Sequence, residues 1–186
     1  MRRHELEHVL RAAKGITDEI EFVVIGSQAI LARIPDPPRF LTYSNEVDVY
    51  PLHAPEKADL IDGAIGELSR FHETYGYYAH GVAPETATLP LKWRERAVIL
   101  ETPLMEGAIG HCLHPVDVAY SKLAAGREKD LVFIREMIRC ELIKGGTLEN
   151  IIAHETETQE LKDLLLARFQ VCRRKTQPKI PGQQGS

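Results

Sequence analysis

Two short β-prone segments with polar residues at their ends constrain the fold of this chain more than any other feature. The first spells Phe-Val-Val-Ile-Gly-Ser-Gln-Ala-Ile over residues 22–30. This pattern is typical of a buried strand, a tight turn at Gly26 and Ser27, and the start of a helix. The second spells Glu-Val-Asp-Val-Tyr and predicts a short strand that carries Glu46 and Asp48. Together they predict an α/β (α+β) fold, in which helices flank a sheet.

The two carboxylates of the second strand predict a metal site. Side chains alternate along a strand, so Glu46 and Asp48 are expected to point to the same face, with Cβ atoms roughly 6.6 Å apart. Carboxylates at that separation repel each other, and one divalent ion, or two ions about 3.5–4 Å apart, would offset the repulsion. We therefore predict that Glu46 and Asp48 bind Mg²⁺ (or Mn²⁺). The alternative is that Asn45 and Glu46 end a loop, so that Asp48 alone faces the cleft.

The turn after the first strand suits a phosphate group. Gly26 allows the backbone to come close to an anion, and Ser27 offers a hydroxyl and an amide at the expected helix N-terminus, where the helix dipole favours negative charge. Combined with the predicted metal, this turn indicates a site for a metal-bound nucleoside triphosphate.

Composition and charge exclude several classes of protein. The formal net charge is −4 and the sequence pI is about 6.1, so an RNA partner would have to use a local basic patch. No apolar run approaches the ~20 residues of a membrane span, and the N-terminus is too charged for a signal peptide. Three widely spaced cysteines indicate reduced thiols rather than a zinc site or disulfides. We expect a cytoplasmic protein with no membrane partner.

Hydrophobic periodicity divides the chain into two parts and a tail. We expect an α/β core over residues 1–105, a helical region over 106–172 that completes the cleft, and a disordered tail over 173–186. The expected strands are 21–25, 46–50, 75–82 and 97–100. The expected helices are 3–13, 26–32, 55–71, 115–125, 127–142, one opening at 147, and 156–172, and residues 105–110 are expected to form a linker.

Cationic and acidic residues are interleaved around the break between two of the predicted helices. A triphosphate is strongly anionic, and Lys122 would bind it as a point charge and Arg127 as a planar fork, with Lys129 as a further cation. Asp117 or Asp130 would hold these cations in place through ion pairs. The alternative is a solvated helix end, stabilised by charge pairs three and four residues apart.

These motifs resemble two related groups of proteins. A Gly-Ser turn followed by an acidic-x-acidic strand resembles the DNA polymerase beta-type nucleotidyltransferase superfamily. The run that begins Lys122-Leu-Ala-Ala and continues through Arg127 to Lys129-Asp130 is similar to a helical motif of AbiEii-type toxin nucleotidyltransferases and their uncharacterised bacterial relatives. A turn containing Leu89-Pro90 and Trp93 also resembles those relatives.

The resemblance implies a fold, an activity and partners. The fold would be a nucleotidyltransferase-type mixed sheet flanked by helices and followed by a helical C-terminal half. The activity would be Mg²⁺-dependent transfer of a nucleoside monophosphate from a nucleoside triphosphate to a hydroxyl group of an RNA, such as tRNA, or of a protein. The chain would then be the toxin of a toxin–antitoxin pair, with an antitoxin protein as its partner.

The chain departs from the superfamily in three ways. The gap between Ser27 and Glu46 is longer than usual and contains the proline-rich segment 35–38, which we interpret as an inserted loop. Glu46 stands where the superfamily mostly has aspartate. The superfamily usually has a third carboxylate on the strand that follows the acidic pair, and this carboxylate helps to deprotonate the attacking hydroxyl. Here the matching strand offers His80 and no acid.

Three residues are candidates for the role of that missing carboxylate. His80 would act as a base, since imidazole titrates near neutral pH, or else it is a partly buried structural histidine. Glu85 and Glu101 are the other candidates. If none of them fills the role, the chain is a catalytically degenerate nucleotidyltransferase fold that binds a nucleotide or a partner.

Overall fold

A mixed β-sheet forms the centre of the computed structural model, which describes residues 1–176. Within these residues the sheet has five strands in the order β3-β2-β1-β5-β4. The strands are β1 (Glu21–Ile25), β2 (Glu46–Pro51), β3 (Tyr78–Gly81), β4 (Val98–Leu100) and β5 (Ile109–Cys112). β1 pairs antiparallel with β2 and parallel with β5, β2 pairs parallel with β3, and β4 pairs antiparallel with β5. The predicted α/β fold with a mixed sheet is therefore confirmed.

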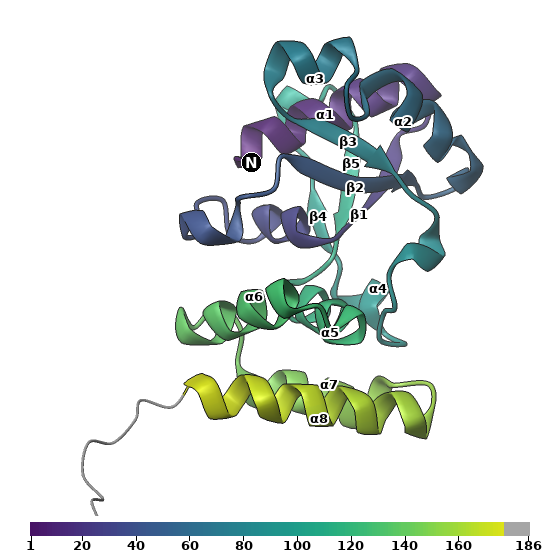
Figure 1. The fold of residues 1–186 in the computed structure, drawn as a ribbon. Helices are drawn as coiled ribbons and strands as arrows, with labels where there is room; N and C mark the ends of the chain where they lie inside the picture. Colours follow the sequence, from purple (N-terminus) through teal and green to yellow (C-terminus); the bar gives the residue numbers. More distant parts are fainter. Residues whose placement is uncertain (177–186) are drawn as a thin grey trace, which may run out of the picture.

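Helices lie on both sides of this sheet (Figure 1). Above it in the figure are α1 (Arg3–Thr17), α2 (Ala58–Ile65) and α3 (Arg70–Tyr75). Below it are α5 (Pro115–Ala125), α6 (Glu128–Arg139), α7 (Gly145–Glu155) and α8 (Gln159–Thr176), with α7 and α8 lowest. The shorter elements are η1 (Ser27–Ala32), η2 (Arg39–Leu41), η3 (Pro55–Lys57), η4 (Pro84–Thr86), α4 (Trp93–Arg96) and η5 (Pro103–Met105).

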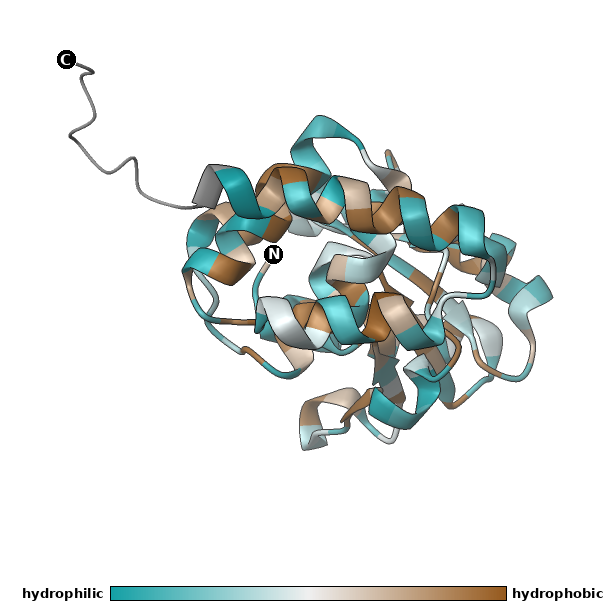
Figure 2. Cartoon of the chain, turned by 90° about the horizontal axis from the view of Figure 1, so that it is seen from below, coloured by the Kyte–Doolittle hydropathy of each residue, from teal (hydrophilic) through white to brown (hydrophobic). Residues whose placement is uncertain are grey.

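The C-terminal helices are amphipathic, as the predicted periodicity requires. Seen from below, α8 carries alternating apolar and polar residues along its length (Figure 2). Its buried side chains include Leu165 and Phe169, and α6 buries Ile134 and Met137 on its inner face. None of the helices within residues 1–176 is long and apolar enough to cross a membrane.

Several element boundaries differ from those predicted. The expected linker 105–110 is wrong, because β5 begins at Ile109 and lies between β1 and β4. The expected helix 55–71 is interrupted after α2, where Leu68 adopts a positive φ of 63° and Ser69 caps α3 by accepting a hydrogen bond from the His72 amide. The first helix, expected to end at residue 13, continues through Gly15 to Thr17 and ends before Asp18, which has a left-handed conformation.

The last two helices also differ at their ends. α7 begins at Gly145 rather than at 147, and α8 extends to Thr176, so the first four residues of the expected tail 173–186 are helical. The remaining tail residues, 177–186, lie outside the described residues.

A buried ion-pair network joins the helical region to the sheet region. The Arg96 guanidinium of α4 donates hydrogen bonds of 2.7 Å to Asp117 Oδ1 on α5 and of 2.7 Å to Glu155 Oε2 on α7. The Asp117 side chain is fully buried and that of Glu155 is 13% exposed. Because partly desolvated charges of this kind are held in one geometry, the network fixes α5 and α7 relative to the strand that follows α4.

Candidate functional site

A cleft of about 1200 Å³ lies between the sheet and the helical region. It takes residues from the end of β1 and the turn into η1, from η2 and the loop before β2, from β2 and β3, from η4, and from α5, α6 and the junction between them. Its lining residues are Ile25, Gly26, Ser27, Phe40, Leu41, Tyr43, Ser44, Glu46, Asp48, His80, Thr86, Ala87, Ser121, Lys122, Ala125, Arg127, Lys129, Asp130, Val132, Phe133 and Glu136. Nine of the ten residues predicted for the site from the sequence therefore line one cavity.

The turn after β1 requires glycine for two reasons. Gly26 has φ 71° and ψ −165°, a backbone conformation open almost only to glycine. A Cβ atom at this position would also overlap Asp48 Oδ2. Gly26 thus allows the Asp48 carboxylate to lie against the backbone of the turn.

Ser27 begins a helix, as predicted, but η1 is a six-residue 3-10 helix. A helix this short supplies a weaker dipole than the α-helix expected from the sequence. The donors that Ser27 offers to the cleft are therefore its own amide and hydroxyl.

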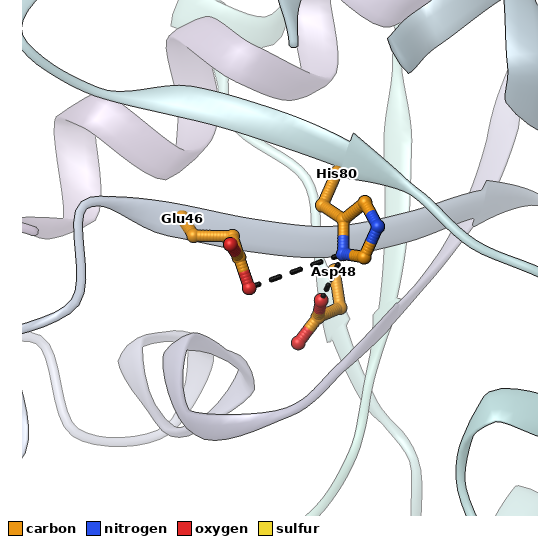
Figure 3. A group of neighbouring side chains, drawn as sticks. All are labelled: Glu46, Asp48 and His80. Carbon is orange, nitrogen blue, oxygen red and sulfur yellow. Dashed lines mark hydrogen bonds and ion pairs between the residues drawn. The ribbon is translucent and has the colours of Figure 1, made fainter. Parts of the chain in front are cut away.

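Glu46, Asp48 and His80 form a compact group on neighbouring strands (Figure 3). The two carboxylates lie on β2 and both line the cleft, so the alternative in which Glu46 belongs to a loop is wrong. Asp48 pairs with His80 in the β2–β3 register, and His80 Nδ1 lies 3.1 Å from Asp48 Oδ1 and 3.9 Å from Glu46 Oε1. One ligand atom from each residue lies within 4.8 Å of those of the other two.

The electrostatics of this group favour a bound cation. Burial raises the pKa of Asp48, and the neighbouring charge of Glu46 raises it further, while the hydrogen bond from His80 opposes them. The two carboxylates are close together and partly buried, and His80 offsets their charge only in part. A divalent ion at this point would offset the remaining charge.

Tyr78, which is not among the predicted site residues, supports Glu46 from outside the described cleft lining. Its hydroxyl donates a hydrogen bond of 2.9 Å to Glu46 Oε2, which orients the carboxylate. Burial is the largest cause that raises the pKa of Tyr78 to about 12, and the hydrogen bond to Glu46 is the next. Strand alternation supplies the missing signal, because Tyr78 and His80 are two residues apart and share a face of β3.

Two of the cations that line the cleft, Lys122 and Arg127, are held by one buried carboxylate. Asp130 is fully buried and accepts hydrogen bonds from Lys122 Nζ at 3.1 Å and from Arg127 Nε at 2.6 Å. Burial would raise the pKa of Asp130, but the hydrogen bonds and charges of its two partners outweigh it and leave the pKa below its usual value. Lys122 Nζ also lies 4.6 Å from the centre of the Phe133 ring. These contacts match the ion pairs predicted for Asp130.

Asp117 is the predicted site residue that the structure places elsewhere. It lies outside the set of described residues that line the cleft and instead pairs with Arg96. Burial raises its pKa, against the opposing effect of Arg96. Of the two carboxylates predicted as alternatives, Asp130 and not Asp117 therefore pairs with Lys122 and Arg127. Glu85 and Glu101 also lie outside that set.

The segment that follows the proline-rich residues 35–38 contributes an apolar wall to the cleft. Phe40, Leu41 and Tyr43 line the cleft, together with Val132 and Phe133 of α6. Tyr43 is 76% exposed, and Arg139 of α6 lies 5.8 Å from the centre of the Phe40 ring. This wall provides aromatic surface beside the charged groups.

Comparison with known proteins identifies a family to which the chain is similar. The model of a family described as "nucleotidyltransferase of unknown function" (DUF6036) matches residues 4–177. No curated protein and no solved structure was found to match the chain.

Proposed function

The chain belongs to that family of nucleotidyltransferases of unknown function, since the match spans nearly all of it, and on this premise we propose that it is a metal-dependent nucleotidyltransferase. It binds a nucleoside triphosphate in the cleft and transfers the nucleoside monophosphate to a hydroxyl group. The hydroxyl oxygen bonds to the α-phosphorus, the bond from that phosphorus to the bridging oxygen breaks, and pyrophosphate leaves. The hydroxyl proton passes to a base or to solvent.

One observation carries this proposal. The cleft places a glycine-serine turn, two carboxylates of one strand and three cations of two helices around a single cavity. Each group suits a different part of a metal–triphosphate complex: the turn and the cations suit phosphate oxygens, and the carboxylates suit the metal. The apolar wall beside them suits a nucleobase, which stacks on aromatic rings.

The donor set fits a divalent ion. Glu46 and Asp48 supply oxygen ligands, and Tyr78 fixes the orientation of Glu46. The second carboxylate, Asp48, lies against Gly26, where the absence of a side chain leaves room for Oδ2. A divalent ion bound there would draw charge from the phosphates and lower the barrier to displacement at the α-phosphorus.

The cations act on the phosphate chain. Asp130 holds Lys122 and Arg127 before the nucleotide arrives, so little side-chain entropy remains to be lost on binding. Arg127 is 61% exposed and can present its remaining N–H groups to the cleft. Lys129 lines the same cleft. Such fixed positive groups stabilise charge that develops on the leaving pyrophosphate.

The variant Asp48→Asn tests the proposal. It keeps the size of the side chain and removes its charge, so we expect it to abolish Mg²⁺-dependent nucleotide binding in calorimetric titrations. Transfer of label from each of the four nucleoside triphosphates to RNA or protein in a lysate should be lost as well. Glu101→Gln is the matched control, because Glu101 is exposed and lies outside the described cleft lining. Unchanged nucleotide binding by Asp48→Asn would contradict the proposal.

A second candidate function is a nucleotide- or partner-binding module without catalysis. It is favoured by the histidine that stands on β3 where the related enzymes have a third carboxylate. The same experiment separates the two functions. Binding of a triphosphate without transfer of label, in the presence of total tRNA and lysate protein, would identify the module.

The toxin role and the acceptor are proposed from the resemblance of the Lys122–Asp130 segment to AbiEii-type toxins. In this hypothesis the chain modifies tRNA or a protein hydroxyl and is neutralised by an antitoxin protein. Growth arrest on expression of the wild type, and its absence with Asp48→Asn, is the expected result. Equal growth of both strains would exclude a toxin.

A further inference from the structure

His80 presents a ring nitrogen to the carboxylates rather than to open solvent. β2 and β3 are parallel, and their register places His80 beside Asp48. Figure 3 shows the ring beside both carboxylates, with Nδ1 as the end of both dashed lines. The imidazole therefore enters the metal-binding group through a defined atom, and that atom comes from the strand next to the carboxylates.

The two distances from His80 to the carboxylates are those between ligands of one ion. Two ligand atoms that each lie ~2.1 Å from an ion are about 3.0 Å apart when the bonds are at right angles and about 4.2 Å apart when they are opposite. His80 Nδ1 lies 3.1 Å from Asp48 Oδ1 and 3.9 Å from Glu46 Oε1, which falls within this range. A nitrogen thus occupies a place where a third oxygen ligand would otherwise be.

The kind of donor decides which ion binds best. Mg²⁺ takes oxygen ligands almost exclusively, whereas imidazole nitrogen suits first-row transition ions. The three side chains are 26–48% exposed, which leaves open positions for water or phosphate oxygens. A site with two carboxylates and one imidazole therefore discriminates against Mg²⁺.

We propose that His80 is a metal ligand and that the cleft selects a divalent first-row transition ion, Mn²⁺ among them, over Mg²⁺. This inference rests on the proposed function, because it concerns the ion of the same site. It also reassigns His80, since a coordinated Nδ1 has no lone pair with which to take a proton. The attacking hydroxyl then loses its proton to a group other than that nitrogen.

The experiment compares the affinities of the full chain for Mn²⁺ and for Mg²⁺. Free Mn²⁺ is measured by its electron paramagnetic resonance signal, and Mg²⁺ is measured by competition. His80→Asp replaces nitrogen by oxygen, so the ratio of Mn²⁺ to Mg²⁺ affinity should fall. We expect a fall of at least about tenfold, because changing even a residue that only hydrogen-bonds to a metal ligand lowers metal affinity by about 10–100-fold. His80→Ala should weaken Mn²⁺ binding more than Mg²⁺ binding.

Spectroscopy adds a readout that a structural histidine would leave unchanged. Bound Mn²⁺ should show electron spin-echo modulation from a directly coordinated ¹⁴N nucleus in the wild type, and His80→Asp should remove it. His53→Ala is the matched control, because His53 is an exposed histidine that pairs with Glu21, and both residues lie outside the described cleft lining. It should keep both the affinity ratio and the modulation.

The outcomes separate this inference from the proposed function. An unchanged affinity ratio in His80→Asp, or no ¹⁴N modulation in the wild type, would overturn the role of His80 while leaving a carboxylate metal site intact. Failure of the wild type to bind either ion would overturn both. Circular dichroism of each variant verifies that the fold is retained, and His80→Asp carries the test if His80→Ala does not fold.

Discussion

At the scale of single residues, the contact between Gly26 and Asp48 links the phosphate turn to the metal strand. Any side chain at position 26 would overlap the Asp48 carboxylate and would hold a backbone with φ of 71°. The carboxylate cannot move away freely, because its other oxygen, Oδ1, lies 3.1 Å from His80 Nδ1. The positions of Asp48 and His80 therefore depend on the absence of a side chain at residue 26, just after the neighbouring strand β1.

Gly26→Ala should reduce both affinity and stability. We expect loss of metal-dependent nucleotide binding in calorimetry, and a decrease of about 1–3 kcal/mol in the free energy of unfolding, from the strained backbone and the displaced carboxylate. Gly15→Ala is the matched control, because a Cβ at Gly15 meets no atom within 4 Å and the residue lies inside α1. It should stabilise by about 0.5–1 kcal/mol. Equal effects of the two changes would contradict the argument.

Asp48 and Asp130 should respond to pH in opposite ways. The raised pKa of Asp48 means that the metal-free protein loses stability as pH rises through that pKa, so Asp48→Asn should raise Tm at pH 7 and have little effect in acid. The lowered pKa of Asp130 means that its contribution is present above the ordinary carboxylate range and is lost as pH falls. Asp130→Asn should therefore cost about 2 kcal/mol at pH 7. Thermal melts from pH 3 to 8 with chelator present provide the measurement, and shifts of the same sign would refute this account.

The sequence predicted those site residues whose partners are local in the chain. Glu46 and Asp48 were identifiable from their spacing on a strand, and Asp130 from its closeness to Arg127. Asp117 was misplaced because its partner Arg96 comes from a different element, which no local pattern reveals. His80 was recognised as a residue of the right strand, but its distance to the carboxylates depends on strand register.

At the scale of elements, the junction between α5 and α6 positions the cations of the cleft. Arg168 of α8 donates hydrogen bonds of 2.7 Å to the Leu123 carbonyl and 2.6 Å to the Ala124 carbonyl, in the last turn of α5. A cation at a helix C-terminus also interacts favourably with the helix dipole. Its guanidinium is so close that a side chain at Gly126 would overlap it. α8 therefore holds the end of the helix that carries Lys122.

Arg168→Ala should weaken both the fold and nucleotide binding. The loss of two charge-assisted hydrogen bonds should lower the free energy of unfolding by about 2 kcal/mol, and loosening of the junction should raise the Kd for nucleotide. Arg173→Ala on the same helix is the control, because the Arg173–Glu149 pair is exposed and should contribute less than about 1 kcal/mol. Urea unfolding and calorimetry measure both effects. If the two variants behave alike, α8 does not position the cations.

Element prediction succeeded where periodicity was long and failed where it was short. The helices near 115–125 and 127–142 were found because many apolar residues recur at helical spacing. β5 was missed because Ile-Gly-His-Cys has four residues and includes a glycine, which weakens a strand signal. The break after α2 was missed because it depends on the positive φ of Leu68, a residue that rarely adopts that conformation.

At the scale of the whole molecule, the predicted boundary at residue 105 falls between elements that depend on each other. β5 follows this boundary, yet it lies inside the sheet and pairs with both β1 and β4. The Arg96 network joins α4, before the boundary, to α5 and α7 after it. A core of residues 1–105 would lack a central strand, so the division stays a prediction that unfolding experiments can test.

The two parts should unfold in one transition. Trp93 lies at the junction in α4, and it is the one tryptophan of the sequence, so its fluorescence reports on the boundary while far-UV circular dichroism reports on all helices. We expect the two signals to change at the same urea concentration, because β5 and Arg96 tie the parts together. Arg96→Ala should leave the fully buried Asp117 without its charge partner and cost about 3 kcal/mol, while the transitions stay coincident through β5. Separate transitions in the wild type would show that the helical region is an independent unit and that the cleft is assembled from two folding units.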